Sequence, residues 1–245
     1  DPNGSIGLNC DAHGNCSCRI GYTGAKCNQC LSGQSGQCIS TKVLVATAQG
    51  ERNTEIIDLA DASFRCTVNQ FPTTVYGATG GLVGNTPMIC GGFAGGPQKS
   101  CYSLTENGQW KHESDLNLAR YFAGTGSVIM NNRLLLAGGY NNGHLDTIEV
   151  VAPNARSKTL PIRLPVAKSE ACIAAWDTNT FIIIGGLGGD QRSTYFINMV
   201  NNTFTSGPNL LTGRFISACH KMNINGEDYI VVAEGTGAKT STEVL

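Results

Sequence analysis

The sequence feature that most constrains the fold is an internal repeat of 47 residues. Each copy has a small residue that is followed 14 residues later by a Gly-Gly doublet. The small residues are Gly77, Gly124, Ala171 and Ala218, and the doublets are Gly91-Gly92, Gly138-Gly139 and Gly185-Gly186, replaced by Glu234-Gly235 in the last copy. Self-similarity at a fixed period of this length is typical of folds that repeat one supersecondary unit.

Each copy consists of short runs of β-branched and aliphatic residues bounded by Gly and Asn turns. In the copy that begins at Gly124 we predict four strands, at residues 124–130, 133–137, 147–151 and 157–160. A count of 31 glycines in 245 residues, with only 14% charged residues, favours an all-β protein rich in tight turns. Four strands per copy at this period predict the blades of a β-propeller.

The copies resemble kelch repeats in three respects: an arginine before the first strand, a hydrophobic strand ending in Gly-Gly, and a following strand such as TIEVV. The resemblance implies a kelch-type β-propeller over residues 43–245. It implies about four and a half blades, a fragment of a ring of six or seven. We expect sequence beyond residue 245 to complete the ring.

Six of the eleven cysteines lie in the first 38 residues. They are Cys10, Cys16, Cys18, Cys27, Cys30 and Cys38. So short a segment cannot bury a sufficient core, which predicts a module held together by disulfides. The thiolates of CSC and CNQC could instead bind zinc, but the GYTG and DAHG turns do not form two knuckles at matched spacing. Disulfides are therefore the favoured interpretation.

The string DPNGSIGLNCDAHGNCSCRIGYTGAKCNQC resembles a laminin-type EGF-like module, assigned to residues 1–38 with a linker at 39–42. The resemblance implies the bridges Cys18–Cys27 and Cys30–Cys38. It also implies that the partners of Cys10 and Cys16 lie upstream of Asp1, so we expect the chain to begin inside this module.

Five cysteines lie in the repeat region. Cys90 and Cys101 bracket the hairpin ICGGFAGGPQKSC and are predicted to form a cross-strand bridge. Cys172 and Cys219 occupy equivalent positions 47 residues apart, and we expect both to be buried as unpaired small apolar side chains. Cys66 has no evident partner.

Charge and hydropathy exclude several classes of partner. The net charge of −1 argues against nucleic acid and against an anionic membrane surface. No apolar run approaches the roughly 20 residues of a membrane helix, so no membrane insertion is expected. The four histidines lack metal-ligand spacing, and neither a metal nor another cofactor is expected.

The candidate binding residues lie in loops that would share one face of a propeller. Tyr140, His144 and Arg192 have no obvious packing role there, and Tyr and Arg are enriched in binding hot spots. Arg120 and Arg214 are further candidates. Because they recur at one repeat position, a structural ion pair or carbonyl contact between blades is an equal alternative for them.

N-glycosylation sequons begin at Asn3, Asn15 and Asn201, and each predicts an exposed loop in an extracellular chain. Asn201, in the turn VNNT, is the favoured acceptor.

The combination of modules resembles large extracellular proteins of the attractin and multiple-EGF-like type. It implies a secreted protein or an ectodomain that binds an extracellular or cell-surface protein and has no catalytic activity. The alternative is a secreted copper-radical oxidase or glycan-active enzyme whose site lies in further blades. The adjacent Cys219 and His220 are its only hint, because such an oxidase needs a Cys–Tyr crosslink and two histidines.

Overall fold

The structure is a computed structural model that describes residues 5–10, 16–18, 22–23, 29–30, 42–58, 61–105, 107–126 and 128–245. Every regular element in these residues is a β-strand, in line with the predicted all-β class. The described part of the chain holds no helix with the length and apolar character needed to span a membrane. The chain divides into two compact units, residues 1–74 with 104–110 and residues 75–103 with 111–245.

The first unit contains two short strand pairs and one antiparallel sheet of three strands. The strands are β1 (Ser5–Cys10), β2 (Cys16–Cys18), β3 (Tyr22–Thr23), β4 (Gln29–Cys30), β5 (Lys42–Ala48), β6 (Glu51–Asp58) and β7 (Asp61–Thr67). The predicted boundaries at residues 38 and 42 stay a prediction.

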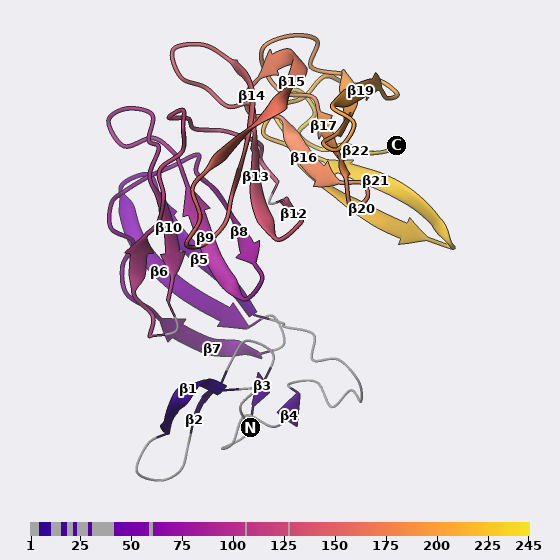
Figure 1. Cartoon of the computed structure of the whole chain (residues 1–245). Helices are drawn as coiled ribbons and strands as arrows, with labels where there is room; N and C mark the ends of the chain where they lie inside the picture. The colour runs from indigo at the N-terminus through magenta and orange to yellow at the C-terminus, as the bar shows by residue number, and fades with distance from the viewer. Residues whose placement is uncertain are drawn as a thin grey trace. The chain divides into compact units, whose positions relative to one another are not determined.

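From β8 onward, four antiparallel sheets follow one another along the chain (Figure 1). Each pairs strands that are consecutive in sequence, so every connection within a sheet is a hairpin. The strands are β8 (Thr79–Val83), β9 (Thr86–Cys90), β10 (Cys101–Leu104), β11 (Trp110–His112), β12 (Ile129–Met130), β13 (Arg133–Ala137), β14 (Leu145–Val151), β15 (Lys158–Lys168), β16 (Cys172–Ala175), β17 (Thr180–Ile184), β18 (Thr194–Asn198), β19 (Thr203–Ser206), β20 (Ala218–Ile224), β21 (Glu227–Ala233) and β22 (Thr242–Val244).

Two strand boundaries in the copy that begins at Gly124 differ from the prediction. The first strand is confined to β12, because Gly124 adopts a φ of 87° and the Thr125 N–H donates to Ala171 of the next sheet, at 2.9 Å, instead of to its own hairpin. The fourth strand, β15, continues to Lys168, well beyond the predicted end at residue 160. Irregular register with β14 lets the strand absorb its two prolines.

Three apolar cores lie between the consecutive sheets, and strand β13 takes part in two of them. Leu134 and Leu136 face the core shared with β9, whereas Leu135 and Ala137 face the core shared with β16 and β17. A third core joins β17 to β21. Alternate side chains of a strand point to opposite faces, so a central strand covered on both faces reads as a continuous apolar run.

The Gly-Gly doublet after β13 lies in close backbone contact with the end of β15 in the same sheet. Gly138 adopts a φ of 67°, and a Cβ there would lie 2.3 Å from the Lys168 carbonyl oxygen. Gly139 then donates its N–H to that same oxygen at 2.8 Å. The doublet thus forms a turn with close packing that a Cβ would obstruct.

Two disulfides lie in the described part of the chain. Cys90–Cys101 joins directly opposed residues of β9 and β10 and is the predicted bridge. Cys172–Cys219 joins β16 to β20 in the next sheet, so the expectation of unpaired thiols was wrong. Equivalent residues of successive repeats lie side by side, which places these two Cα atoms 5.9 Å apart. The side chains of Cys18, Cys27, Cys30, Cys38 and Cys66 lie outside the described residues.

Candidate binding face

Six partly exposed rings form a continuous row in the second unit, which we call the aromatic row. It consists of Tyr76, Phe93, Tyr121, Phe122, Tyr140 and His144. The rings come from the segments before β8 and β12 and from the β9–β10 and β13–β14 loops. Two isolated antiparallel β-bridges support them: Tyr76 pairs with Phe93, and Tyr121 pairs with Tyr140.

Tyr121 is the centre of the row. Its ring centroid lies 5.1 Å from Phe93, 5.0 Å from Phe122 and 5.6 Å from Tyr140. The row ends at His144, whose ring lies 5.4 Å from that of Tyr140 in an edge-on arrangement. Separations and tilts of this kind stabilise aromatic pairs. The row therefore presents a pre-organised apolar surface rather than separate mobile side chains.

A repeated backbone hydrogen bond links the four sheets below the row. The Phe122 N–H donates to the Gly77 carbonyl, the Glu170 N–H to that of Phe122, and the Ile216 N–H to that of Glu170. The distances are 2.7, 3.0 and 2.9 Å, and all four residues have positive φ. A left-handed conformation is strained for Phe, Glu and Ile, so the linked framework holds these residues in place.

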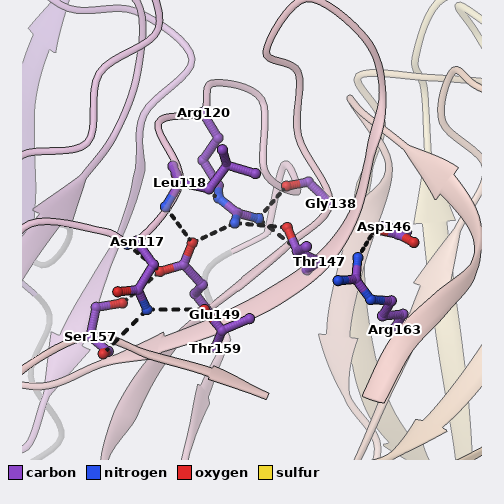
Figure 2. A network of polar contacts seen from close by, with 10 residues as sticks. All are labelled: Asn117, Leu118, Arg120, Gly138, Asp146, Thr147, Glu149, Ser157, Thr159 and Arg163. Atoms are coloured by element: carbon purple, nitrogen blue, oxygen red, sulfur yellow. Dashed lines mark hydrogen bonds and ion pairs between the residues drawn. The ribbon is translucent and has the colours of Figure 1, made fainter. Parts of the chain in front are cut away.

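Arg120 is part of the framework and not of the surface. Its side chain is fully buried, and its guanidinium donates to Glu149 at 2.6 Å and to the Gly138 carbonyl at 2.7 Å (Figure 2). Glu149 also accepts the Asn117 N–H at 2.8 Å. A side chain with no exposed surface cannot contact a partner. The prediction of Arg120 as a binding residue was therefore wrong, and its structural alternative describes the contact.

Arg214 repeats this arrangement in the last sheet, with its guanidinium bonded to the Glu243 carboxylate and to the Ser241 carbonyl at 3.0 Å. Its side chain is fully buried, so its assignment as a binding residue was wrong for the same reason. Burial acts to raise the pKa of Glu243. Hydrogen bonds from the Leu211 and Thr212 N–H groups and from Arg214 outweigh burial and lower that pKa.

In the repeat between those of Arg120 and Arg214, Lys168 occupies the position that corresponds to the two arginines. Its carbonyl accepts the Gly139 N–H just as the Arg120 carbonyl accepts the Gly92 N–H. The Lys168 ammonium donates to the Gly185 and Asp190 carbonyls at 2.7 and 3.2 Å. The position equivalent to Glu149 is Phe196, 47 residues later, so this buried cation has carbonyl oxygens where the arginines have a carboxylate.

Burial of Lys168 predicts a pH-dependent stability. Desolvation lowers its pKa from 10.5 to about 8, although Asp190 opposes the shift. Between these values the unfolded chain binds more protons than the folded chain, so stability rises with pH from about 8 to about 10.5. We expect a gain of about 2 kcal/mol after discounting for screening.

The measurement is urea unfolding of the native protein and of Lys168→Met at pH 7.5 and pH 10. Tyrosines also titrate near pH 10, but they contribute equally in both proteins, so the difference in pH dependence reports Lys168 alone. Equal pH dependence of the two proteins would contradict the assignment.

The structure brings two of the three loop residues predicted for binding into the aromatic row. Tyr140 and His144 are its end, and His144 Nδ1 lies 2.9 Å from the Ser169 hydroxyl. Arg192 is exposed in the β17–β18 loop and forms an ion pair with Asp190 at 3.3 Å. A Cβ on Gly188 of that loop would lie 2.9 Å from the His144 ring, so the loop adjoins the row.

Sequence reasoning missed the other four rings, although a signal for them was present. An aromatic residue precedes the first strand at Tyr76, Tyr121 and Phe215, and another follows the Gly-Gly doublet at Phe93 and Tyr140. Of these positions, only Tyr140 was predicted as a binding residue. Their recurrence in successive repeats predicts a line of rings.

A hollow of about 330 Å³ lies next to the row, against the first strands of the sheets. It is lined by Gly77, Ala78, Thr79, Gly80, Phe122, Gly124, Thr125, Gly126 and Ile216. The buried Ser217 hydroxyl, beside Ile216, has no hydrogen-bond partner in the described residues. Small residues and backbone form most of this lining, so the hollow offers shape and peptide groups rather than charge.

The structure removes the sequence feature that hinted at an oxidase centre, the pair Cys219 and His220. Cys219 is bonded to Cys172 and has no thiol for a crosslink to tyrosine. Within the described ranges, no three histidine, cysteine or acidic side chains are grouped as they would be around a metal ion. Of the three sequons, Asn201 is exposed in the turn between β18 and β19, and Asn3 and Asn15 lie outside the described residues.

These features define an all-β protein with disulfides and a pre-organised aromatic surface. Residues 1–42 match the Laminin EGF domain, in agreement with the predicted resemblance. The chain is also similar to a solved structure entitled "Structure of YjhT", with a TM-score of 0.67 and 10% sequence identity over 80% of this chain and 70% of that chain. No curated protein matches the sequence. The likeness to YjhT concerns the fold alone.

Proposed function

We propose that this chain is a non-catalytic extracellular module that binds another protein through the aromatic row and the adjoining Arg192 loop. A Laminin EGF domain and disulfides are typical of extracellular proteins that interact with other proteins. The observation that carries the proposal is the row itself: six rings from four segments, partly exposed and mutually packed. Aromatic side chains at the centre of an interface provide much of its binding energy.

The proposal includes a kelch-type β-propeller fragment as the scaffold. Its support is the succession of hairpin-connected sheets, each packed on the next through an apolar core. The repeated hydrogen bond through Phe122, Glu170 and Ile216 is what a radial arrangement of blades around one axis needs. Loops that leave the same end of each blade then gather on one face, where a partner can contact several of them.

The double substitution Tyr140→Ala with Arg192→Ala tests the binding face. We expect at least about tenfold weaker capture of the partner, because truncation of interface Tyr and Arg residues costs about 1–4 kcal/mol. The chain, produced in a secretory host, is screened against a panel of purified cell-surface ectodomains. The affinity of each captured ectodomain is then measured for both proteins.

The matched control is Tyr229→Ala with Arg133→Ala, which removes the same residue types near the β20–β21 and β12–β13 hairpins. Circular dichroism checks that each variant is folded. If the Tyr140 and Arg192 variant binds as tightly as the native chain, or if the control loses as much affinity, the proposed face is wrong.

A further inference from the structure

Glu170, whose backbone is bonded to Phe122 of the aromatic row, is a carboxylate that has no counter-ion among the described residues. Its backbone is fixed there by two bonds of the inter-sheet series, to Phe122 and to Ile216. Its side chain is half-buried, and no hydrogen bond or ion pair of the carboxylate occurs with any described residue. Burial raises its pKa, because desolvation disfavours the charged carboxylate.

The Tyr121 phenol lies within electrostatic reach of this carboxylate. Burial raises the pKa of the Tyr121 phenol, and negative charge at Tyr140, Tyr76 and Glu170 raises it further. The two cations nearest in sequence are already in use. Lys168 donates to the Gly185 carbonyl, and Arg163 is paired with Asp146. The site therefore combines aromatic ring faces with one negative charge that no cation of the described residues neutralises.

We propose that Glu170 and the aromatic row form a subsite for an arginine side chain of the protein partner, presented on an extended basic segment. The inference rests on the proposed binding function and specifies the chemistry of the partner. Ring faces attract cations, and a guanidinium is the cation that also stacks flat on an aromatic ring. The same group pairs with a carboxylate in a planar geometry, so Tyr121 and Glu170 together favour arginine over lysine.

The probe is a bead-displayed library of ten-residue peptides in which every arginine peptide has a counterpart with citrulline at the same position. Citrulline keeps the shape of arginine and removes its charge. We expect the native chain to capture arginine peptides at least about tenfold better than their citrulline counterparts. Glu170→Gln, which keeps the size of the side chain, is expected to abolish this preference. Asp228→Asn removes an exposed carboxylate of β21 and is expected to retain it.

The possible failures of the two proposals differ. Equal capture of arginine and citrulline peptides overturns the arginine subsite and leaves the binding function standing. An arginine preference that survives in Glu170→Gln also overturns the subsite, because the charge then acts elsewhere. Capture of neither peptide set, together with no capture in the ectodomain screen, overturns both proposals.

Discussion

Replacing Glu149 with alanine is expected to lower the free energy of unfolding by about 3–5 kcal/mol. The Arg120 guanidinium would remain fully buried without its carboxylate, and a buried charge that loses its partner is strongly destabilising. The substitution also removes the acceptor of the Asn117 and Leu118 N–H groups and of the Ser157 hydroxyl. Among the described residues, no other carboxylate accepts a hydrogen bond from these donors.

Urea unfolding measures the effect, and Asp146→Asn is the matched control. Asp146 lies on the same strand, β14, and pairs with Arg163 at 2.6 Å, but both side chains of this pair are exposed (Figure 2). Exposed ion pairs contribute about 0–1 kcal/mol, so the control is expected to change little. If both substitutions lower the free energy of unfolding by the same amount, the buried Arg120–Glu149 pair contributes no more to stability than the exposed pair, and the prediction is wrong.

Removing the Cys172–Cys219 disulfide is expected to cost about 4 kcal/mol. The bridge closes a loop of 47 residues, and the entropy that such a loop loses in the unfolded chain gives a value of this size. It also connects two consecutive sheets, so its loss releases the β20–β22 sheet from its covalent tie to β16. The experiment is thermal and urea unfolding of the variant Cys172→Ala with Cys219→Ala.

The variant Cys90→Ala with Cys101→Ala is the control for this loss. Its bridge spans 11 residues within one hairpin, for which the same relation gives about 3 kcal/mol. We therefore expect the inter-sheet bridge to be worth about 1 kcal/mol more than the hairpin bridge. The opposite order would show that loop length does not govern the contribution of these two disulfides.

The hydrophobic runs and the Gly-Gly doublets carry most of the fold information that can be taken from the sequence. Arg133–Ala137 was predicted to the residue because both faces of that strand are buried, and its apolar run is continuous. The start of β12 was not predicted, since Thr125 bonds to Ala171 of the next repeat, and a contact between repeats has no local signal in the sequence.

The site was harder to predict than the fold. Tyr140 and His144 stand out as loop residues, whereas Tyr76 and Phe122 lie beside apolar runs and read as core. The role of the two recurring arginines, binding or structural, was ambiguous in the sequence. Each guanidinium is buried against a carboxylate that lies 29 residues away in sequence. The Cys172–Cys219 bridge was missed because equivalent positions in repeats become neighbours only when the sheets are stacked.

The hydrogen bonds that run from Gly77 through Phe122 and Glu170 to Ile216 use only backbone atoms, so they do not depend on the side chains at these positions. Phe122, Glu170 and Ile216 occupy the same left-handed position in three sheets, yet their side chains are aromatic, acidic and aliphatic. A mutation that exchanges one of these side chains leaves the connecting bonds intact. Each repeat thus contributes one variable side chain at an equivalent backbone position, and the chemistry of these side chains can change without a new fold.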